Sequence, residues 1–143
     1  LQESNETDPV RFLDVLNRTL YGNIQRIDSY KNMTLALLDY QNGSLSLSGQ
    51  HEEAIVVRTD GNIERIDTMH LGFPLGLEAE IAEFVSQTQI NLNPGDVVVL
   101  YTDGITEAFD INKVQYGLKN LCEVVWANRH KSAIEIRQAA IED

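Results

Sequence analysis

Apolar side chains recur at helical spacing near the start of the chain. Between Pro9 and about Arg26 they lie on one stripe, which consists of Val10, Leu13, Leu16 and Leu20. Asp8 precedes this stretch as a capping residue, and proline is tolerated in the first helical turn. The spacing therefore predicts an amphipathic helix from Pro9 to about Arg26 that packs on a sheet.

The period of the pattern then changes to that of strands. The stretch from Met33 to Tyr40 is apolar on both faces, which is typical of a central strand, whereas Ser44–Ser48 alternates strictly between polar and apolar residues. Asn42-Gly43 lies between them and is the strongest two-residue signal for a hairpin. We therefore predict a hairpin whose first strand is central and whose second strand is half-exposed.

More strands follow at short intervals. Ala54 to Arg58 predicts one strand, Asp60-Gly61 a tight turn, and Asn62 to Ile66 a short return strand. A half-buried strand is expected next, because alternate residues share one face: Phe84, Ser86, Thr88, Ile90 and Leu92. Asn93-Pro94-Gly95-Asp96 then predicts a turn into a strand from Val97 to Tyr101.

The apolar run from Val97 to Leu100 leads directly to Asp103 and Gly104. Its lack of alternation predicts a strand buried on both faces. A carboxylate at the end of such a strand is costly without partners, so Asp103 is expected to require a cation or hydrogen-bond donors. The alternative is a plain turn, in which Asp103 bonds its own backbone and Gly104 takes a positive φ angle.

Helical spacing returns in the last third of the chain. We predict helices from Tyr116 to about Asn128 and from Ser132 to the end, with Ser132 as a cap. Consecutive strands flanked by helices indicate the α+β class with a largely antiparallel sheet. The 143 residues are appropriate for one domain, and the pattern contains no repeat, linker or low-complexity segment.

Charge and cysteine content narrow the function classes. The formal net charge is −11, from 22 acidic and 11 basic residues, which argues against binding to nucleic acid or to an anionic membrane. The single cysteine, Cys122, excludes an internal disulfide and a cysteine-built metal site, and its helical context favours a small core residue. No apolar run is long enough to span a membrane and no signal segment is evident, so we expect a cytoplasmic protein.

Several motifs occur in the order found in one enzyme family. The chain resembles the SpoIIE/RsbU-type branch of the metal-dependent (type 2C, PPM) serine/threonine protein phosphatases over nearly its whole length. The segments that carry the resemblance are Met33–Asp39 with Asn42-Gly43, Ser48–Glu52, Gly72–Leu77, Asn91–Ala108 with its Thr-Asp-Gly turn, and Tyr116–Leu118.

The resemblance implies a fold and a chemistry. The fold is a four-layer αββα sandwich of largely antiparallel sheets, present here only in part. The implied reaction is hydrolysis of phosphoserine or phosphothreonine by two Mn²⁺ or Mg²⁺ ions that are held by aspartates. Asp103 matches the metal-binding aspartate, and Gly104 matches the neighbour that lets the backbone approach the metal. His51 and Glu107 are weaker candidates for catalytic roles.

The chain also departs from the family pattern. The Gly-Asp-x-x-x-Asp and Asp-x-x-Gly-His-Gly motifs are absent before Asp8, and the downstream Asp-Asp motif is absent because Glu142-Asp143 is followed by no strand. Residues 1–143 are therefore expected to be the middle-to-C-terminal part of a single phosphatase domain. Because this part carries only one of the several metal ligands of the family, we expect it to be inactive alone.

The remaining candidates each have a second interpretation. His51 aligns with the histidine of an Asn-Ala-Gly-His-x-Pro-Pro loop, but the loop here lacks the Asn and both prolines, so a solvated loop residue is the alternative. Glu107 is expected near the start of a short helix that begins at Thr106, where the helix dipole favours a carboxylate. The Gly72–Leu77 loop is either a turn with apolar anchors or part of a regulatory switch.

Other polar residues are expected to be structural. His70 and His130 show no ligand spacing and are expected to be structural or exposed. Asp96 and Asp110 are expected in turns or caps rather than as metal ligands.

Three functional hypotheses follow. The first is a phosphatase that acts on an anti-anti-sigma-factor-like (STAS) phosphoprotein under the control of a sensor or receiver domain. The second is a non-catalytic phosphatase-fold module that binds a signalling partner. The third is association into a homodimer, because a partial sandwich exposes sheet edges and a core face.

Overall fold

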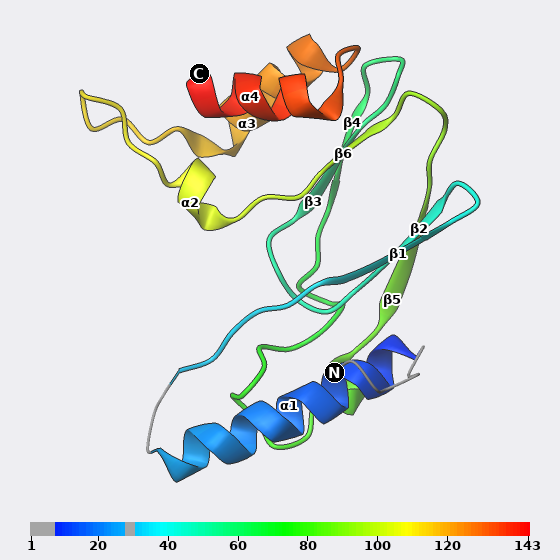
Figure 1. Cartoon of the computed structure of the whole chain (residues 1–143), viewed down its shortest axis with the longest axis vertical. Helices are drawn as coiled ribbons and strands as arrows, with labels where there is room; N and C mark the ends of the chain where they lie inside the picture. The colour runs from blue at the N-terminus through cyan, green and yellow to red at the C-terminus, as the bar shows by residue number, and fades with distance from the viewer. Residues whose placement is uncertain (1–7, 28–30) are drawn as a thin grey trace. The chain divides into compact units, whose positions relative to one another are not determined.

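The computed structural model describes residues 8–27 and 31–143 (Figure 1). The chain folds into two compact units, unit 1 (residues 1–51 and 68–91) and unit 2 (residues 52–67 and 92–143). The elements in chain order are α1 (Pro9–Arg26), β1 (Leu37–Gln41), β2 (Ser44–Ser48), β3 (Ala54–Val57), β4 (Ile63–Ile66), η1 (Ala82–Phe84), β5 (Gln87–Asn91), β6 (Val97–Val99), α2 (Asp103–Thr106), α3 (Gly117–Asn128) and α4 (Ala133–Glu142).

Helix α1 of unit 1 has the predicted bounds. The Asp8 side chain accepts a hydrogen bond from the Val10 N–H at 3.0 Å, and Pro9 is the first helical residue. Leu13 lies on the buried face and packs with Leu75, Ile81 and Val85 in the apolar core of unit 1. The capping chemistry and the apolar stripe therefore form the helix that the spacing predicts.

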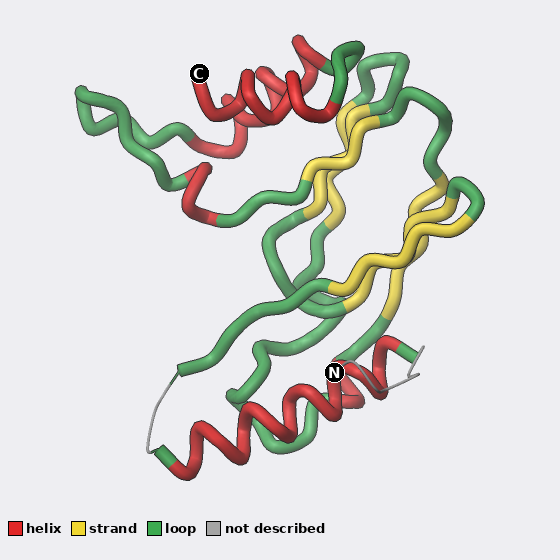
Figure 2. Tube along the Cα trace, viewed as in Figure 1, coloured by secondary structure: helices red, strands yellow, loops and turns green. Residues whose placement is uncertain are grey.

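The sheet of unit 1 is antiparallel, with the strand order β1-β2-β5. The strands are drawn in yellow in Figure 2. The hairpin prediction is confirmed, but the predicted roles of its strands were wrong: β2 is central, and β1 is an edge strand that is largely exposed. Because β2 has a neighbour on each side, its Leu45 and Leu47 are shielded, whereas Tyr40 on β1 is exposed. The prediction for Phe84–Leu92 holds only from Gln87, since Phe84 belongs to the 3₁₀ turn η1.

A buried polar residue joins α1 to the following loop in unit 1. Asn17 is 0% exposed; its Oδ1 accepts the Gly76 N–H at 2.8 Å, and its Nδ2 donates to the Glu78 carbonyl at 2.9 Å and to the Ala79 carbonyl at 3.3 Å. Gly76 has a φ of +86°, and Gly72 lies so close to Gly49 that a Cβ would approach the Gly49 Cα to 2.7 Å. The Gly72–Leu77 segment is thus a closely packed loop with a buried apolar anchor, Leu75.

The sheet of unit 2 is also antiparallel, with the strand order β4-β3-β6. All four residues of β3 are buried, whereas those of β6 are half-buried and Leu100 is exposed. The prediction that Val97–Leu100 is a strand buried on both faces was therefore wrong. The physical reason is position, since β6 is an edge strand and β3 is the central strand with a neighbour on each side.

Two helices pack against the sheet of unit 2. Helices α3 and α4 lie together (Figure 1), and their Leu121, Val125 and Ile136 form a core with Ile55 and Val57 of β3. The predicted cap of α4 is confirmed as a full capping box, in which the Ser132 side chain accepts from the Glu135 backbone and the Glu135 side chain accepts from the Ser132 backbone. The predicted α+β class with antiparallel sheets is confirmed in both units.

An ion cluster connects the β3–β4 hairpin to the start of β6. Arg58 donates to both carboxylate oxygens of Glu64 at 2.8 Å and to Asp96 at 2.8 Å. Asp96 also accepts from the backbone of Asn93 and Thr59, and these bonds together with Arg58 lower its pKa to about 2. Asp96 is thus a turn residue, as predicted, and in addition the buried anion of this cluster.

Candidate functional site

Asp103 is the first residue of α2, a single turn of helix that follows β6. Its backbone carbonyl accepts the Glu107 N–H at 2.7 Å and the Thr106 hydroxyl at 3.2 Å. The residue is exposed, and no hydrogen bond to its carboxylate is found within residues 8–27 and 31–143. The apolar strand is therefore followed by an exposed carboxylate at the start of α2.

The plain-turn alternative for Asp103 and Gly104 is wrong. Both residues are helical, and Gly104 does not have the positive φ angle that the alternative requires. The only atom near a Cβ built on Gly104 would be the Thr102 hydroxyl, at the ordinary contact distance of 3.7 Å. Neither backbone conformation nor crowding thus demands glycine here, so its predicted approach to a metal stays a prediction.

Glu107 lies at the C-terminal end of α2, whereas the prediction placed it near the start of this helix. It is the C-terminal cap, because the helix begins at Asp103 rather than at Thr106. Its side chain is exposed. The expected stabilisation by the positive end of the helix dipole therefore does not apply to this carboxylate.

His51 follows β2 in unit 1, in a loop whose backbone is held by Thr68. The His51 N–H donates to the Thr68 hydroxyl at 3.0 Å, and that hydroxyl donates to the His51 carbonyl. The imidazole Nδ1 lies 3.3 Å from the hydroxyl of Thr34. The loop is thus fixed while the ring stays partly exposed, and the two other histidines, His70 and His130, are exposed as expected.

The described residues do not by themselves fit the implied metal centre. Within residues 8–27 and 31–143 there is no group of three or more His, Cys, Asp or Glu side chains arranged to hold a metal ion. Hard divalent ions need six or more oxygen ligands in total, of which water supplies only a part. Asp103 provides a carboxylate in the right chemical class but without protein partners among the described residues.

Several titratable groups lie near Tyr101, just before Asp103 in the chain: Glu53, Arg65 and Cys122. Arg65 pairs with Glu53 at 2.6 Å. Burial raises the pKa of Tyr101, and the negative charges of Glu53 and Glu52 raise it further. Burial also raises the pKa of the Cys122 thiol, which is half-buried against the core of unit 2. Cys122 is therefore a packing residue, as predicted.

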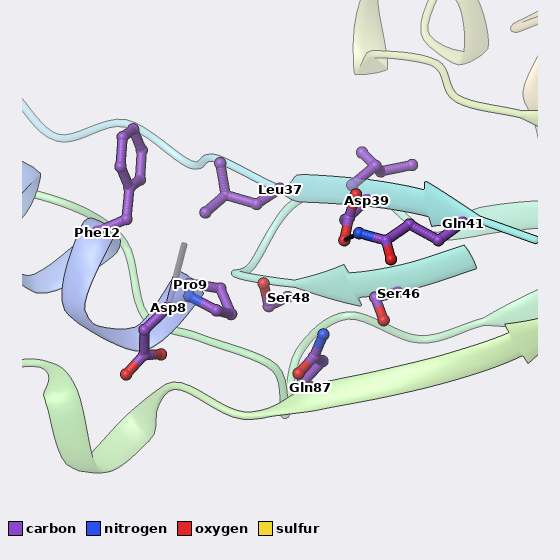
Figure 3. A pocket seen from close by; sticks show the side chains of 10 residues that line it. Asp8, Pro9, Phe12, Leu37, Asp39, Gln41, Ser46, Ser48 and Gln87 are labelled. Atoms are coloured by element: carbon purple, nitrogen blue, oxygen red, sulfur yellow. Dashed lines mark hydrogen bonds between the residues drawn. The ribbon is translucent and has the colours of Figure 1, made fainter. Parts of the chain in front are cut away.

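Unit 1 contains a separate hollow between the start of α1 and its sheet (Figure 3). Its volume is about 390 Å³, and its lining includes Phe12, Leu37, Ser46, Ser48 and Gln87. None of the four residues proposed from the sequence as site residues lines it. All of its lining residues belong to unit 1.

A family model described as Stage II sporulation protein E (SpoIIE) matches residues 2–143. The chain belongs to the SpoIIE family. Protein IcfG of Synechocystis sp. is 26% identical over 100 residues, a match that covers 69% of this chain and 15% of IcfG. The SpoIIE resemblance noted from the motifs is thus confirmed.

Solved structures with low sequence identity share the fold. The SiaA-PP2C domain of Pseudomonas aeruginosa matches with a TM-score of 0.74 and 14% identity over 99% of this chain. The phosphatase domain of SpoIIE from Bacillus subtilis, presoaked with Mn, matches with a TM-score of 0.57 and 14% identity over 98% of this chain. The fold is therefore the PP2C phosphatase fold, and the chain spans 55% and 65% of these two solved chains.

No membrane-spanning candidate is found in the part of the chain that the structure describes. Its helices are too short or too polar to cross a bilayer.

Proposed function

We propose that this chain is part of a Mn²⁺- or Mg²⁺-dependent phosphatase that hydrolyses phosphoserine or phosphothreonine in a bacterial signalling protein. The observation that carries the proposal is the exposed carboxylate of Asp103, at the end of an apolar strand in a member of the SpoIIE family. An acidic side chain that is held at a strand end and left open to solvent suits a hard divalent cation. The Mn presoak of the related SpoIIE structure supports the same metal class.

Asp103 cannot hold such ions alone, so we propose that the other ligands belong to segments of a longer protein. The shorter span of this chain relative to the solved phosphatase domains supports this view. Residues 1–143 then form the middle-to-C-terminal part of one phosphatase domain, and they are inactive without the remainder. Gly104 is proposed to let the backbone approach the metal, and His51 and Glu107 remain weaker catalytic proposals.

The substrate and its control are proposed from the family. An anti-anti-sigma-factor-like (STAS) phosphoprotein is the proposed substrate, and a sensor or receiver domain in the same protein is the proposed regulator. We place this activity in the cytoplasm, where such signalling proteins act and where an unpaired cysteine such as Cys122 is stable.

The decisive experiment compares Asp103→Asn with the wild type in the full-length protein. Hydrolysis of para-nitrophenyl phosphate and of a phosphoserine protein is measured over a range of Mn²⁺ concentrations. Loss of a partner that only orients a metal ligand costs about 10- to 100-fold in affinity or activity, so loss of a ligand should lower kcat/KM by at least about 100-fold. The Mn²⁺ concentration needed for half-maximal activity should rise as well.

Asp39→Asn is the matched control, because it removes one negative charge from an exposed aspartate in unit 1. Its activity should equal that of the wild type. Normal Mn²⁺-dependent activity of Asp103→Asn would contradict the assignment of Asp103. Absence of hydrolysis by the wild-type full-length protein would instead favour the non-catalytic binding module.

The glycine proposal has its own test. Gly104→Ala leaves the fold unstrained, since a Cβ there meets only one atom at ordinary contact distance. A loss of Mn²⁺ affinity in a variant of unchanged thermal stability would support the backbone role. Unchanged affinity would contradict it.

A further inference from the structure

The segment between α2 and α3 is a long loop (Figure 2). Backbone hydrogen bonds join its two ends. Phe109 and Gln115 form an antiparallel bridge, and the Tyr116 N–H donates to the Ala108 carbonyl at 2.7 Å. The Asp110 carboxylate accepts the N–H groups of Asn112 and Val114, each at 2.8 Å. These hydrogen bonds fix the loop backbone, so the loop presents its side chains in a defined arrangement.

The loop presents large apolar side chains to the solvent. Phe109 is 67% exposed, Ile111 is 99% exposed and Val114 is 62% exposed. A loop that only connects two helices gains no stability from apolar side chains in water. An apolar cluster on a fixed loop is typical of a surface that contacts another protein.

The same loop forms one wall of a groove in unit 2. The groove has a volume of about 580 Å³. Phe109 and Val114 of the loop line it together with Ala140 and Ile141 of α4, and Ile105 of α2 also contributes. Ile141 is itself 64% exposed, so both the loop and α4 leave apolar surface open to solvent. The dimensions suit one or two apolar side chains of a peptide segment.

The charges around the groove indicate the charge of the segment that would bind there. Its lining contains no lysine or arginine among the described residues, and it contains two acidic residues, Asp110 and Asp143. The exposed carboxylate of Glu107 belongs to the cap of the adjoining helix. Lys113 of the loop is exposed but does not line the groove. A second copy of this chain would bring a net charge of −11 against this acidic rim, which disfavours self-association here. A segment with lysine or arginine beside its apolar side chains would complement both the apolar lining and the acidic residues of this groove.

We propose that this groove binds a segment of the phosphoprotein substrate in which apolar anchor residues are flanked by lysine or arginine. The proposal rests on the proposed function and adds a docking site to it. Helix α2 begins at Asp103 and lines the groove through Gly104 and Ile105, so a docked segment lies beside the candidate site. Docking contacts that are equal in ground and transition states change KM and leave kcat unaltered.

Peptide binding to this chain is the first test. The probe is a fluorescein-labelled peptide with two leucines between pairs of lysines, measured by fluorescence anisotropy. Phe109→Ser should weaken binding by at least about tenfold, as expected for an aromatic anchor in an interface. It should leave the fold intact because Phe109 is 67% exposed. Ile134→Ser is the matched control, since Ile134 is exposed on α4 but does not line the groove.

Two further peptides separate the chemical requirements. A peptide with serines in place of the leucines, and one with glutamates in place of the lysines, should each bind much more weakly than the probe. Equal binding of the serine peptide would overturn the proposal, because charge alone would then explain binding. Concentration-dependent dimerisation that Phe109→Ser abolishes would also overturn it, because the occupant would be a second copy.

Kinetics of the full-length protein complete the test. With a phosphoserine version of the leucine-lysine peptide, Phe109→Ser should raise KM about tenfold at unchanged kcat, while hydrolysis of para-nitrophenyl phosphate stays the same. Peptide binding without any hydrolysis would contradict the proposed function alone. Hydrolysis in which Phe109→Ser changes neither KM nor binding would contradict the docking site alone.

Discussion

In each unit, polar side chains join segments that are distant in the sequence, but the chemistry of these contacts differs. Unit 1 relies on the neutral Asn17, which is fully buried and bonded only to backbone groups. Unit 2 relies on the charged cluster of Arg58, Glu64 and Asp96 beside its sheet. An amide has no charge to lose, whereas an ion cluster depends on pH and salt.

The stability of the two units is therefore expected to respond differently to pH and salt. Replacing Asn17 leaves one N–H and two carbonyls of the 76–79 segment without their partner, at any pH. The cluster in unit 2 instead joins the β3–β4 hairpin to β6, the strand that leads to Asp103. The strand that leads to the candidate metal ligand is thus held by this charged cluster in addition to its backbone pairing with β3.

The largest expected effect is that of Asn17→Leu. It should lower the free energy of unfolding by about 3 kcal/mol, because it leaves several buried backbone groups unsatisfied. Urea unfolding followed by circular dichroism measures this change, which should be the same at pH 5 and pH 7.5. Asn23→Leu is the control on the exposed face of α1, with an expected change within about 0.5 kcal/mol. A small effect of Asn17→Leu would show that the loop relaxes around the lost amide.

Asp96→Asn should have the next largest effect. At pH 7 it should cost about 2 kcal/mol, since hydrogen bonds to a charged group are the stronger ones. The native pKa is lowered from 3.8 to about 2, so the stabilisation is present above pH 3.8 and is lost as pH falls toward 2. The difference between variant and wild type should therefore shrink in urea titrations between pH 5 and pH 2.5.

Asp60→Asn provides the control for this series. Asp60 is an exposed turn residue whose carboxylate accepts the Asn62 N–H, and an asparagine retains that acceptor. Its effect should stay within about 0.5 kcal/mol at every pH. A pH-independent loss in Asp96→Asn would indicate that hydrogen-bond geometry, rather than charge, holds the cluster.

Ser132→Ala should have the smallest effect of the three stability variants. Loss of an N-cap side chain costs about 1 kcal/mol. The hydrogen bonds from Ser132 also lower the pKa of Glu135, so the contribution of the Glu135 charge is lost as pH falls below its ordinary value of 4.5. Thermal unfolding should show a modest shift, and restoration by Ser132→Thr would confirm that the hydroxyl acts as the cap.

Local signals in the sequence predicted much of this fold. The bounds of α1 follow from Asp8-Pro9 and the apolar stripe, and the β1–β2 hairpin follows from Asn42-Gly43. Asn17 lies four residues after Leu13 and therefore on the apolar stripe of α1, a position at which a polar residue is unexpected. A polar residue at such a position indicates a buried hydrogen-bonding role, although not the identity of its partners.

The candidate site was predicted only in part. The motif proposed Asp103 as a metal ligand, a role that stays a prediction, and the structure places this residue exposed at the start of α2 rather than in a turn. The groove of unit 2 that is proposed to bind the substrate could not be predicted from the sequence. Its walls come from Phe109 and Ile141, which are distant along the chain. The predicted position of Glu107 near a helix start was wrong, because helix boundaries depend on backbone hydrogen bonds that composition does not specify.

By itself, the sequence determined the order of helices and strands, the turns, the caps and the family, because these depend on residue periodicity and on neighbours along the chain. Only the tertiary structure decided that β2 and β3 are the central strands, that Asn17 bonds to residues 76–79 and that Arg58 meets Asp96. Those features depend on interactions between distant segments, whose energies are set by burial and charge in the folded chain.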